Sequence, residues 1–260
     1  MTGKRVLVTG SSGIAAALIH ALNFRKDSIY ILGGTDDTSS KLAAECDNIV
    51  GFSTIDLRDE EACQRGFHEA KEALGGINHV VGIVGGSGRS FGDAKFDKIT
   101  LDGWRDTLSL NLNTAFLTLR EGLRTLMPSG GSITLTSSVL ATSPVYDKFS
   151  THAYATSKYA IEGMVKLAAS AYVEQKIRVN AVAPGLVTTP MSLRATNDPE
   201  IQQFIQLKQP LTGGQLTPEE IISAYLYCID NSSISGEILD RKSTRLNSSH
   251  SSVSRMPSSA

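Results

Sequence analysis

Short apolar runs alternate with longer helix-compatible stretches along the chain, and this alternation constrains the fold more than any other feature. The apolar runs have the length of buried strands. They lie at residues 6–8, 29–32, 48–52, 79–84, 132–136 and 177–183, with a last short strand expected at 234–239. The stretches between them predict helices at 13–24, 38–46, 59–74, 100–127, 152–174 and 217–229. Because right-handed crossovers place each connecting helix over the sheet, the sequence predicts one α/β domain, a doubly wound parallel sheet with helices on both faces.

The composition fits one large domain and indicates where the protein works. A chain of 260 residues, 41% of them apolar, can bury a large core without cross-links. The cysteines at 46, 63 and 228 have neither metal-ligand spacing nor a disulfide pattern, so we expect no metal and a reducing compartment. The N-terminal strand leaves no room for a signal peptide, and no apolar run approaches the ~18 residues of a membrane span. We therefore expect a soluble, cytoplasmic protein.

The charge balance indicates the kind of partner. There are 25 basic and 26 acidic residues, which gives a formal net charge of −1. So small a net charge creates no overall field that would recruit nucleic acid or an anionic membrane. We expect the partner to be a small molecule.

The last residues of the chain differ in character from the rest. Residues 240–260, DRKSTRLNSSHSSVSRMPSSA, are rich in serine and lack apolar periodicity. They resemble the translation of a sequencing adapter in one continuous frame, and a natural flexible tail is the alternative. We expect residues 1–239 to form the domain and 240–260 to be a non-native, disordered tail. The tail has four basic residues and one acidic residue, so residues 1–239 carry a net charge of −4.

A glycine-containing loop follows the first predicted strand and opens the first predicted helix. Its sequence is Thr9-Gly10-Ser11-Ser12-Gly13-Ile14-Ala15-Ala16. In such strand–loop–helix units, backbone N–H groups at the helix N-terminus bind a dinucleotide pyrophosphate. Gly10 permits the tight turn, Gly13 permits close approach of a phosphate, and Ala16 is small enough for the helix to pack on the strand. A purely structural turn is the alternative reading of the loop alone.

The second chemical signal is a tyrosine followed four residues later by a lysine. Tyr154 and Lys158 lie in the predicted helix 152–174, where this spacing puts them on one face. A positive charge ~4 Å from the phenol contributes roughly 4 kcal/mol at an effective dielectric of 20, about three pKa units. Tyr154 could then exchange protons near neutral pH. The alternative is a tyrosine that packs over the lysine stem on a surface helix.

Two further polar residues are candidates for the same site. Ser138 follows the predicted strand 132–136, at the edge where open α/β sheets bind ligands. Its hydroxyl can donate to a substrate carbonyl, or it can simply cap a turn. Asn111 lies inside the predicted helix 100–127. Asparagine is unfavourable there, which indicates either a polar role or a solvated face.

These motifs, in this order, resemble the short-chain dehydrogenase/reductase family over about residues 4–239. The resemblance implies a Rossmann-like fold and an NAD(P)-dependent oxidoreductase that interconverts a secondary alcohol and a ketone by hydride transfer. It implies Tyr154 as general acid/base, with Lys158 lowering its pKa and binding the nicotinamide ribose. Ser138 would position the reacting carbonyl, and Asn111 would hold a proton-relay water. Family members commonly form homo-oligomers, so we expect a tetramer or a dimer.

The resemblance also implies which residues surround the cofactor. The pyrophosphate would meet Gly10, Ser11, Ser12, Gly13 and Ile14, the adenosine half Thr35, Asp56 and Leu57, and the nicotinamide half Val84, Gly85, Tyr154, Lys158, Pro184, Gly185, Val187 and Thr189. After the second strand, Asp36 and Asp37 stand where a basic residue would favour NADP. Carboxylates repel a 2′-phosphate, so NAD is favoured over NADP.

Two departures from the family pattern keep other functions open. Only two residues separate Gly10 from Gly13, where the usual loop has three. This spacing is similar to that of extended or atypical members, which include epimerases and dehydratases that use bound NAD. The usual Asn-Asn-Ala-Gly after the fourth strand is replaced by GIVG at 82–85. A non-catalytic protein that senses dinucleotides is the other alternative, although the joint presence of serine, tyrosine and lysine speaks against it.

The sequence gives little information on the substrate. Arg89, in a glycine-rich loop, is a candidate for binding a carboxylate, and a solvated side chain is the alternative. Residues 143–149 lie between the serine and the tyrosine and are expected to form a wall of the pocket. Residues 191–210 are the expected lid.

Overall fold

The protein forms one parallel sheet, which confirms the predicted fold class. The computed structural model describes residues 3–143 and 149–241. The sheet has seven strands in the order β3-β2-β1-β4-β5-β6-β7, with every neighbouring pair parallel. The strands are β1 (Arg5–Thr9), β2 (Ser28–Leu32), β3 (Ile49–Ser53), β4 (His79–Gly82), β5 (Gly131–Thr136), β6 (Ile177–Pro184) and β7 (Ile238–Arg241). The strand order reverses direction between β1 and β4, and ligands of open α/β sheets bind at such a point.

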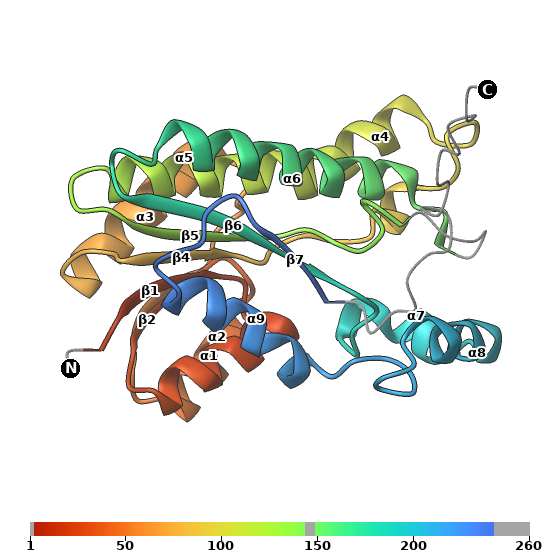
Figure 1. The fold of residues 1–260 in the computed structure, drawn as a ribbon, viewed down its shortest axis with the longest axis horizontal. Helices are drawn as coiled ribbons and strands as arrows, with labels where there is room; N and C mark the ends of the chain where they lie inside the picture. The colour runs from red at the N-terminus through yellow and green to blue at the C-terminus, as the bar shows by residue number, and fades with distance from the viewer. Residues whose placement is uncertain (1–2, 144–148, 242–260) are drawn as a thin grey trace, which may run out of the picture.

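Helices cover both faces of the sheet (Figure 1). They are α1 (Ile14–Phe24), α2 (Asp36–Glu45), α3 (Glu60–Leu74), α4 (Leu101–Leu108), α5 (Thr114–Leu126), α6 (His152–Ala171), α7 (Leu193–Thr196), α8 (Pro199–Lys208) and α9 (Pro218–Asp230). One layer holds α3, α5 and α6, the other α1, α2 and α9, while α7 and α8 lie past one end of the sheet. Within the described residues, no helix combines the length and apolarity needed to cross a bilayer.

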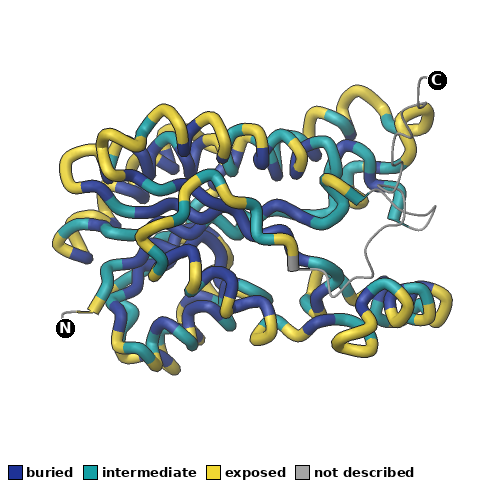
Figure 2. The backbone as a smooth tube through the Cα atoms, viewed as in Figure 1, coloured by how far each residue is buried: buried dark blue, intermediate teal, exposed yellow. Residues whose placement is uncertain are grey.

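The core consists of two apolar layers, one on each face of the sheet. Leu7 and Ile133 belong to the layer under α3, α5 and α6, whereas Val8 and Val81 belong to the layer under α1 and α9. Neighbouring strand residues therefore pack on opposite faces, as the alternation of a strand requires. In Figure 2 the central strands are largely buried, and exposed backbone is concentrated on the outer sides of the helices and in the loops. The edge strand β3 is intermediate or exposed throughout. Continuous apolar runs are the sequence counterpart of strands buried on both faces.

Local capping explains where several helices begin. Thr217 and Glu220 form the reciprocal capping box at the start of α9, which the sequence Thr-Pro-Glu-Glu predicts. Thr35, Asp59 and Thr100 each accept a backbone N–H at the start of α2, α3 and α4. No such side-chain cap occurs at α1, so no side chain competes with another acceptor for the N–H groups of its first turn.

The predicted helix 100–127 is interrupted, so the expectation of one regular helix is wrong. A π-helical turn, η2 (Ser109–Asn113), joins α4 to α5. The wider turn carries Asn111 into the interior, where it is fully buried and bonds to backbone groups. Apolar periodicity does not register a single wide turn, because the apolar faces on either side of it remain helical.

The C-terminal boundary also differs from the prediction. The last strand begins at Ile238 rather than at 234, and it continues through Asp240 and Arg241, whose backbones pair with Ala183 and Pro184. The first two residues of the segment that resembles an adapter therefore extend the sheet. The predicted disorder of residues 242–260 falls outside the described residues, as does part of the predicted pocket wall, residues 144–148.

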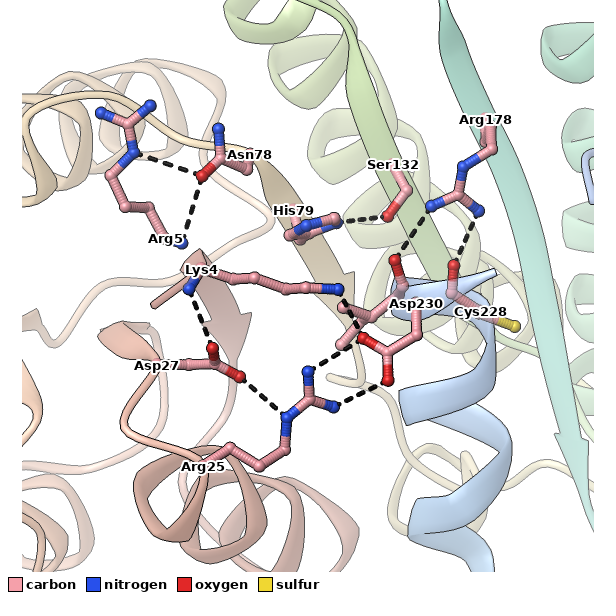
Figure 3. A network of polar contacts seen from close by, with 11 residues as sticks. Lys4, Arg5, Arg25, Asp27, Asn78, His79, Ser132, Arg178, Cys228 and Asp230 are labelled. Carbon is pink, nitrogen blue, oxygen red and sulfur yellow. Dashed lines mark hydrogen bonds and ion pairs between the residues drawn. The ribbon is translucent and has the colours of Figure 1, made fainter. Parts of the chain in front are cut away.

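A polar network closes the amino-terminal edge of the sheet (Figure 3). Asp230, at the end of α9, pairs with Lys4 and with Arg25, whose guanidinium lies 2.9 Å from the carboxylate. Arg25 also pairs with Asp27 at 3.2 Å. The network joins the starts of β1 and β2 to the end of α9. Nearby, Nδ1 of His79 lies 2.7 Å from the Ser132 hydroxyl, between two neighbouring strands.

The buried ring of His79 should make the stability of the protein depend on pH. Burial, reinforced by nearby cations such as Lys4 and Arg178, lowers the pKa of His79 from 6.5 to about 3. Below pH 6.5 the unfolded chain binds a proton that the folded protein excludes, so the free energy of unfolding falls as the pH falls. Between pH 7.5 and 5.5 we expect this residue to account for a loss of about 1.4 kcal/mol.

Urea unfolding at the two pH values measures this loss. In His79→Asn the pH dependence should be smaller than in the parent by that amount, because the proton-binding group is gone. His68→Asn, on the exposed surface of α3, is the control for removal of an imidazole. Equal pH dependence in the parent and in His79→Asn would contradict the expectation.

Candidate active site

A cavity of about 980 Å³ opens at the carboxyl ends of the strands. It is lined by Gly10, Ser11, Ser12, Gly13, Ile14, Thr35, Asp56, Leu57, Val84, Gly85, Ser138, Tyr154, Lys158, Pro184, Gly185, Val187 and Thr189. These are all of the residues predicted to surround a cofactor, together with the predicted catalytic serine. Asn111 is the one predicted site residue that is not on its wall. The fold thus brings the predicted set together, while the role of each toward a ligand stays a prediction.

The glycine loop forms an open cradle at the start of α1. Gly10 and Gly13 have φ values of +91° and +55°, which residues other than glycine rarely adopt. A Cβ on Gly13 would lie 3.0 Å from Cγ2 of Thr189, so the loop closely approaches the segment after β6. The first turn of α1 has no side-chain cap and no acidic residue. Uncapped N–H groups and the positive end of a helix dipole fit a phosphate, so the residues present can hold a dinucleotide pyrophosphate.

Two residues expected to meet the adenosine are held by their neighbours. Thr35 lines the cavity and caps α2 by accepting the N–H of Thr38. The carboxylate of Asp56, also on the wall, is held by Arg58, with 2.6 Å between Nη2 and Oδ2. This pair lowers the pKa of Asp56, chiefly through the hydrogen bond. The pairing of a guanidinium with the aspartate expected to meet the adenine is not evident from the sequence.

Lys158 is buried beside the cavity and is held by a strand carbonyl. Its Nζ donates to the carbonyl oxygen of Thr136 at 2.8 Å, and the residue is 3% exposed. The Thr136 hydroxyl in turn donates to the Gly82 carbonyl at 2.8 Å and lies 2.7 Å from the hydroxyl of the buried Tyr225. Burial lowers the pKa of Lys158 to about 8. Thr136 and Tyr225 therefore position the lysine, and periodic patterns in the sequence do not reveal either of them.

Tyr154 faces Ser138, but its pKa shift is opposite to the one expected. Ser138 is close enough to lower the pKa of its phenol, and Nζ of Lys158 lies 5.5 Å from the centre of its ring. Burial raises the pKa of the Tyr154 phenol above 10.0, and only the bond with Ser138 opposes this rise. Burial thus acts against the expected acidification of the phenol, and the Lys158 ammonium donates to the Thr136 carbonyl. That Tyr154 exchanges protons near neutral pH stays a prediction.

Asn111 holds the backbone beside the site. Its Oδ1 accepts the N–H of Gly86 at 3.0 Å, while its Nδ2 donates to the carbonyls of Gly86 and Thr107, each at 2.9 Å. A side chain at Gly85 would meet Oδ1 of Asn111 at 2.7 Å and Nζ of Lys158 at 3.2 Å. The buried amide thus fixes the strand-end segment that separates it from the cavity. Its expected role with a proton-relay water remains a prediction.

Asp93 fixes the start of the helix that carries Tyr154. Its Oδ1 accepts the N–H of Ala153 at 3.0 Å and its Oδ2 accepts the N–H of Tyr154 at 2.9 Å. The residue at the start of α6, Thr151, provides no side-chain cap of its own. Asp93 is 4% exposed, so this charge-assisted contact is shielded from water. Residue patterns along the helix do not reveal this cap, because Asp93 lies 60 residues before the helix that it caps.

The expected lid contains regular structure. Residues 191–210 include α7 and α8, whose Ala195, Ile201 and Ile205 form a small apolar core of their own. Arg194, Phe204 and Lys208 from these helices line the cavity, as do Arg89 and Phe149. Whether the segment moves as a lid stays a prediction. Its helices were missed because they are short and their apolar residues face a local cluster.

Comparisons with known proteins identify the family. The family described as Enoyl-(Acyl carrier protein) reductase matches residues 8–240 of the chain. The 3-oxoacyl-(acyl-carrier-protein) reductase FabG of Aquifex aeolicus is 30% identical over 247 residues, covering 92% of this chain and 96% of the relative. A 3beta-hydroxysteroid dehydrogenase of Mediterraneibacter gnavus is 29% identical over 202 residues, covering 75% of this chain and 70% of the relative.

Solved structures share the fold. Levodione reductase has a TM-score of 0.82 at 22% identity, covering 94% of this chain and 98% of that one. A short-chain type dehydrogenase/reductase from Mycobacterium ulcerans has a TM-score of 0.82 at 20% identity, covering 92% and 89%. The fold and the matches together define an oxidoreductase of the Rossmann type. The chain belongs to the short-chain dehydrogenase/reductase family, as its motifs predict.

The close approach at Gly85 can be tested by adding a methyl group. Gly85→Ala should reduce the free energy of unfolding by about 1–3 kcal/mol, because the new Cβ would displace the hydrogen-bonded Asn111 amide or the Lys158 ammonium. Gly214→Ala is the matched control, since a Cβ there has no neighbour within 4 Å and the glycine has no positive φ. Urea unfolding of both variants measures the difference. Equal free energies of unfolding of the two variants would contradict the expectation, because the backbone around Gly85 would then have moved to accommodate the methyl group.

Proposed function

We propose that the protein is an NAD(P)-dependent oxidoreductase that interconverts a secondary alcohol and a ketone. The observation that carries the proposal is that Ser138, Tyr154 and the buried Lys158 line the same cavity as the glycine cradle. A proton donor, its hydrogen-bond partner and a buried ammonium converge there. Membership of an oxidoreductase family whose relatives are named dehydrogenases and reductases agrees with this chemistry.

The protein's own residues handle the proton. A nicotinamide dinucleotide, when bound, supplies or accepts the hydride at the substrate carbon. Ser138 and Tyr154 would both hydrogen-bond to the carbonyl oxygen, and the Tyr154 O–H would donate its proton to that oxygen as the alkoxide forms. The raised pKa of the phenol keeps it protonated at neutral pH. The protein is thus prepared for carbonyl reduction, whereas alcohol oxidation first requires loss of that proton.

The cofactor would be held along the whole cavity. The cradle from Gly10 to Ile14 suits the pyrophosphate, and Lys158 suits the hydroxyls of the nicotinamide ribose. Asp36 and Asp37 occupy the first turn of α2, just after the cavity residue Thr35. Their negative charge near the adenosine ribose favours NAD over NADP. Comparison of kcat/KM for the two cofactors tests this preference.

We also propose a homo-oligomer that forms through α5 and α6. Apolar side chains are exposed on both helices, with Phe116 46%, Tyr159 62% and Leu167 75% exposed. Exposed apolar groups gathered on neighbouring helices indicate a surface that another chain covers.

Removal of the phenolic hydroxyl tests the function. We screen ketones and secondary alcohols spectrophotometrically with NAD(H) and NADP(H). Tyr154→Phe should lower kcat roughly 100- to 10,000-fold, as expected for loss of a general acid. Dinucleotide binding, measured by fluorescence titration, should be kept in the variant.

The other outcomes separate the rival functions. Cofactor binding without any Tyr154-dependent turnover would identify a dinucleotide sensor. Substrate conversion without net change in cofactor absorbance would identify an epimerase or a dehydratase. Tyr227→Phe, exposed on α9 and not among the residues that line the cavity, is the control for loss of a phenol.

The buried lysine gives the activity a pH limit. Because burial lowers the pKa of Lys158 to about 8, its positive charge is present below that pH and is lost above it. We therefore expect kcat/KM for ketone reduction to fall as the pH rises through about 8. Tyr154 does not contribute to this fall, since its own pKa is raised.

The pH profile of Lys158→Met identifies the group that titrates. The variant should have a lower kcat/KM at neutral pH and no decline near pH 8. A decline of the same size in the variant would assign the titration to another group.

A further inference from the structure

The chain continues along the cavity wall after β6 ends. Within the described residues, the pairing of β6 with its neighbouring strands reaches Pro184 and goes no further. Pro184, Gly185, Val187 and Thr189 line the cavity, and they are the residues expected to meet the nicotinamide half of a cofactor. The backbone of this 184–189 segment therefore has to find its hydrogen-bond partners outside the sheet.

The side chain of Gln209 supplies these partners. Gln209 directly follows α8, is 3% exposed and lies on the cavity wall. Its Oε1 accepts the N–H of Leu186 at 2.7 Å, and its Nε2 donates to the Leu186 carbonyl at 3.2 Å. The carboxamide thus pairs with Leu186 through one donor and one acceptor, as the backbone of a neighbouring strand would.

Gln209 also joins the two ends of the segment that contains α7 and α8. Its Nε2 donates a second hydrogen bond to the Gly214 carbonyl at 2.7 Å. Beside it, the N–H of Leu216 donates to the Leu186 carbonyl at 2.9 Å, and the N–H of Thr188 donates to the Leu216 carbonyl at 2.8 Å. The chain therefore leaves and re-enters this wall at one place, and the buried carboxamide lies at that place.

The far end of the 184–189 segment is held as well. Thr189 donates its N–H to Oγ of Ser192 at 2.9 Å. Its Cγ2 lies so near the glycine cradle that a Cβ on Gly13 would be 3.0 Å away. Because Thr189 is held beside the cradle, the position of the middle of the segment depends on the partners of Leu186.

The contacts of the carboxamide also indicate how it acts. Both hydrogens of Nε2 are donated to protein carbonyls, and Oε1 accepts a protein N–H. A buried amide that is satisfied in this way is stable without a ligand. Gln209 is therefore placed to act on a bound molecule through the backbone of Leu186 and not by direct contact.

We propose that Gln209 is a positioning residue, which holds the 184–189 segment against the nicotinamide ring of the cofactor. The proposal rests on the function proposed above, because it requires a nicotinamide dinucleotide in the cavity. Removal of the carboxamide takes a partner from the Leu186 N–H and from the Gly214 carbonyl, and the segment would shift to satisfy them. Binding of the ring should then weaken, whereas the glycine cradle, which Gln209 does not contact, should keep its affinity for the pyrophosphate.

ADP-ribose separates the ring from the rest of the cofactor, because it has the adenosine, the pyrophosphate and the second ribose but no nicotinamide. Isothermal titration calorimetry measures the affinity of the protein for NADH and for ADP-ribose. If NADPH binds more tightly than NADH, it is compared with 2′-phospho-ADP-ribose. Gln209→Met, which keeps the length of the side chain, should reduce the preference for the nicotinamide-bearing ligand roughly tenfold. The affinity for the ADP-ribose ligand should stay the same.

Hydrogen exchange in the ligand-free protein measures the contact itself. The Leu186 amide should exchange roughly tenfold faster in Gln209→Met, because its acceptor is gone. Gln202→Met is the matched control. Gln202 is another hydrogen-bonded glutamine of α8, whose Nε2 donates to the Ala195 carbonyl at 2.7 Å, and it does not line the cavity. The control should change neither the ligand preference nor the exchange of Leu186.

A second variant covers the case in which Gln209→Met does not fold. Gln209→Glu keeps an acceptor for the Leu186 N–H and loses both donated hydrogen bonds, so it should also reduce the preference for the nicotinamide-bearing ligand. Thermal unfolding and the unchanged affinity for ADP-ribose check that each variant is folded.

The outcomes distinguish this inference from the proposed function. Equal affinity of the parent for the two ligands, a preference that survives in both Gln209 variants, or an equal loss of affinity for both ligands would overturn the inference. Tyr154-dependent ketone reduction by the parent would leave the proposed function standing in each of those cases. Conversely, a preference that depends on Gln209, without any Tyr154-dependent turnover, would support the inference on the ring and refute the oxidoreductase. A parent that binds neither ligand would refute both.

Discussion

The buried ammonium of Lys158 is the constraint on which the site depends. A charge removed from water is costly unless polar groups surround it. Here the carbonyl of Thr136 accepts a hydrogen bond from the ammonium, with 2.8 Å between nitrogen and oxygen. Thr136 is itself held by Gly82 and Tyr225. The absence of a side chain at Gly85 leaves room for the ammonium. The ends of β4 and β5 and the helix α6 therefore have to meet at one point, and the cavity forms around it.

One loop connects the cavity to the helix that carries Tyr154. The segment after β4 carries Asp93, which caps α6 at Tyr154, and Arg89, which lines the cavity. The position of Tyr154 therefore depends on a residue far outside its own helix.

Much of the fold and of the site was predictable because the signals are local. The apolar runs around Val8, Ile31 and Ile133 are strands buried on both faces. Strands of this kind consist almost wholly of apolar residues, so they can be recognised in the sequence. The glycine loop and the four-residue spacing of Tyr154 and Lys158 are local geometry as well. The failures were long-range. The π-helical turn at Asn111, the extension of β7 through Asp240 and the cap from Asp93 all depend on distant partners.

The sequence by itself determined the parallel sheet, the helix that bears the tyrosine and the lysine, and the family, because each follows from residue spacing along one element. Tertiary structure decided the burial of those two residues and therefore the direction in which their pKa values shift. Sequence spacing predicted a phenol made acidic by its neighbour, whereas burial raises its pKa and lowers that of the lysine. Desolvation depends on what surrounds a group in three dimensions, and residue spacing along one helix does not record it.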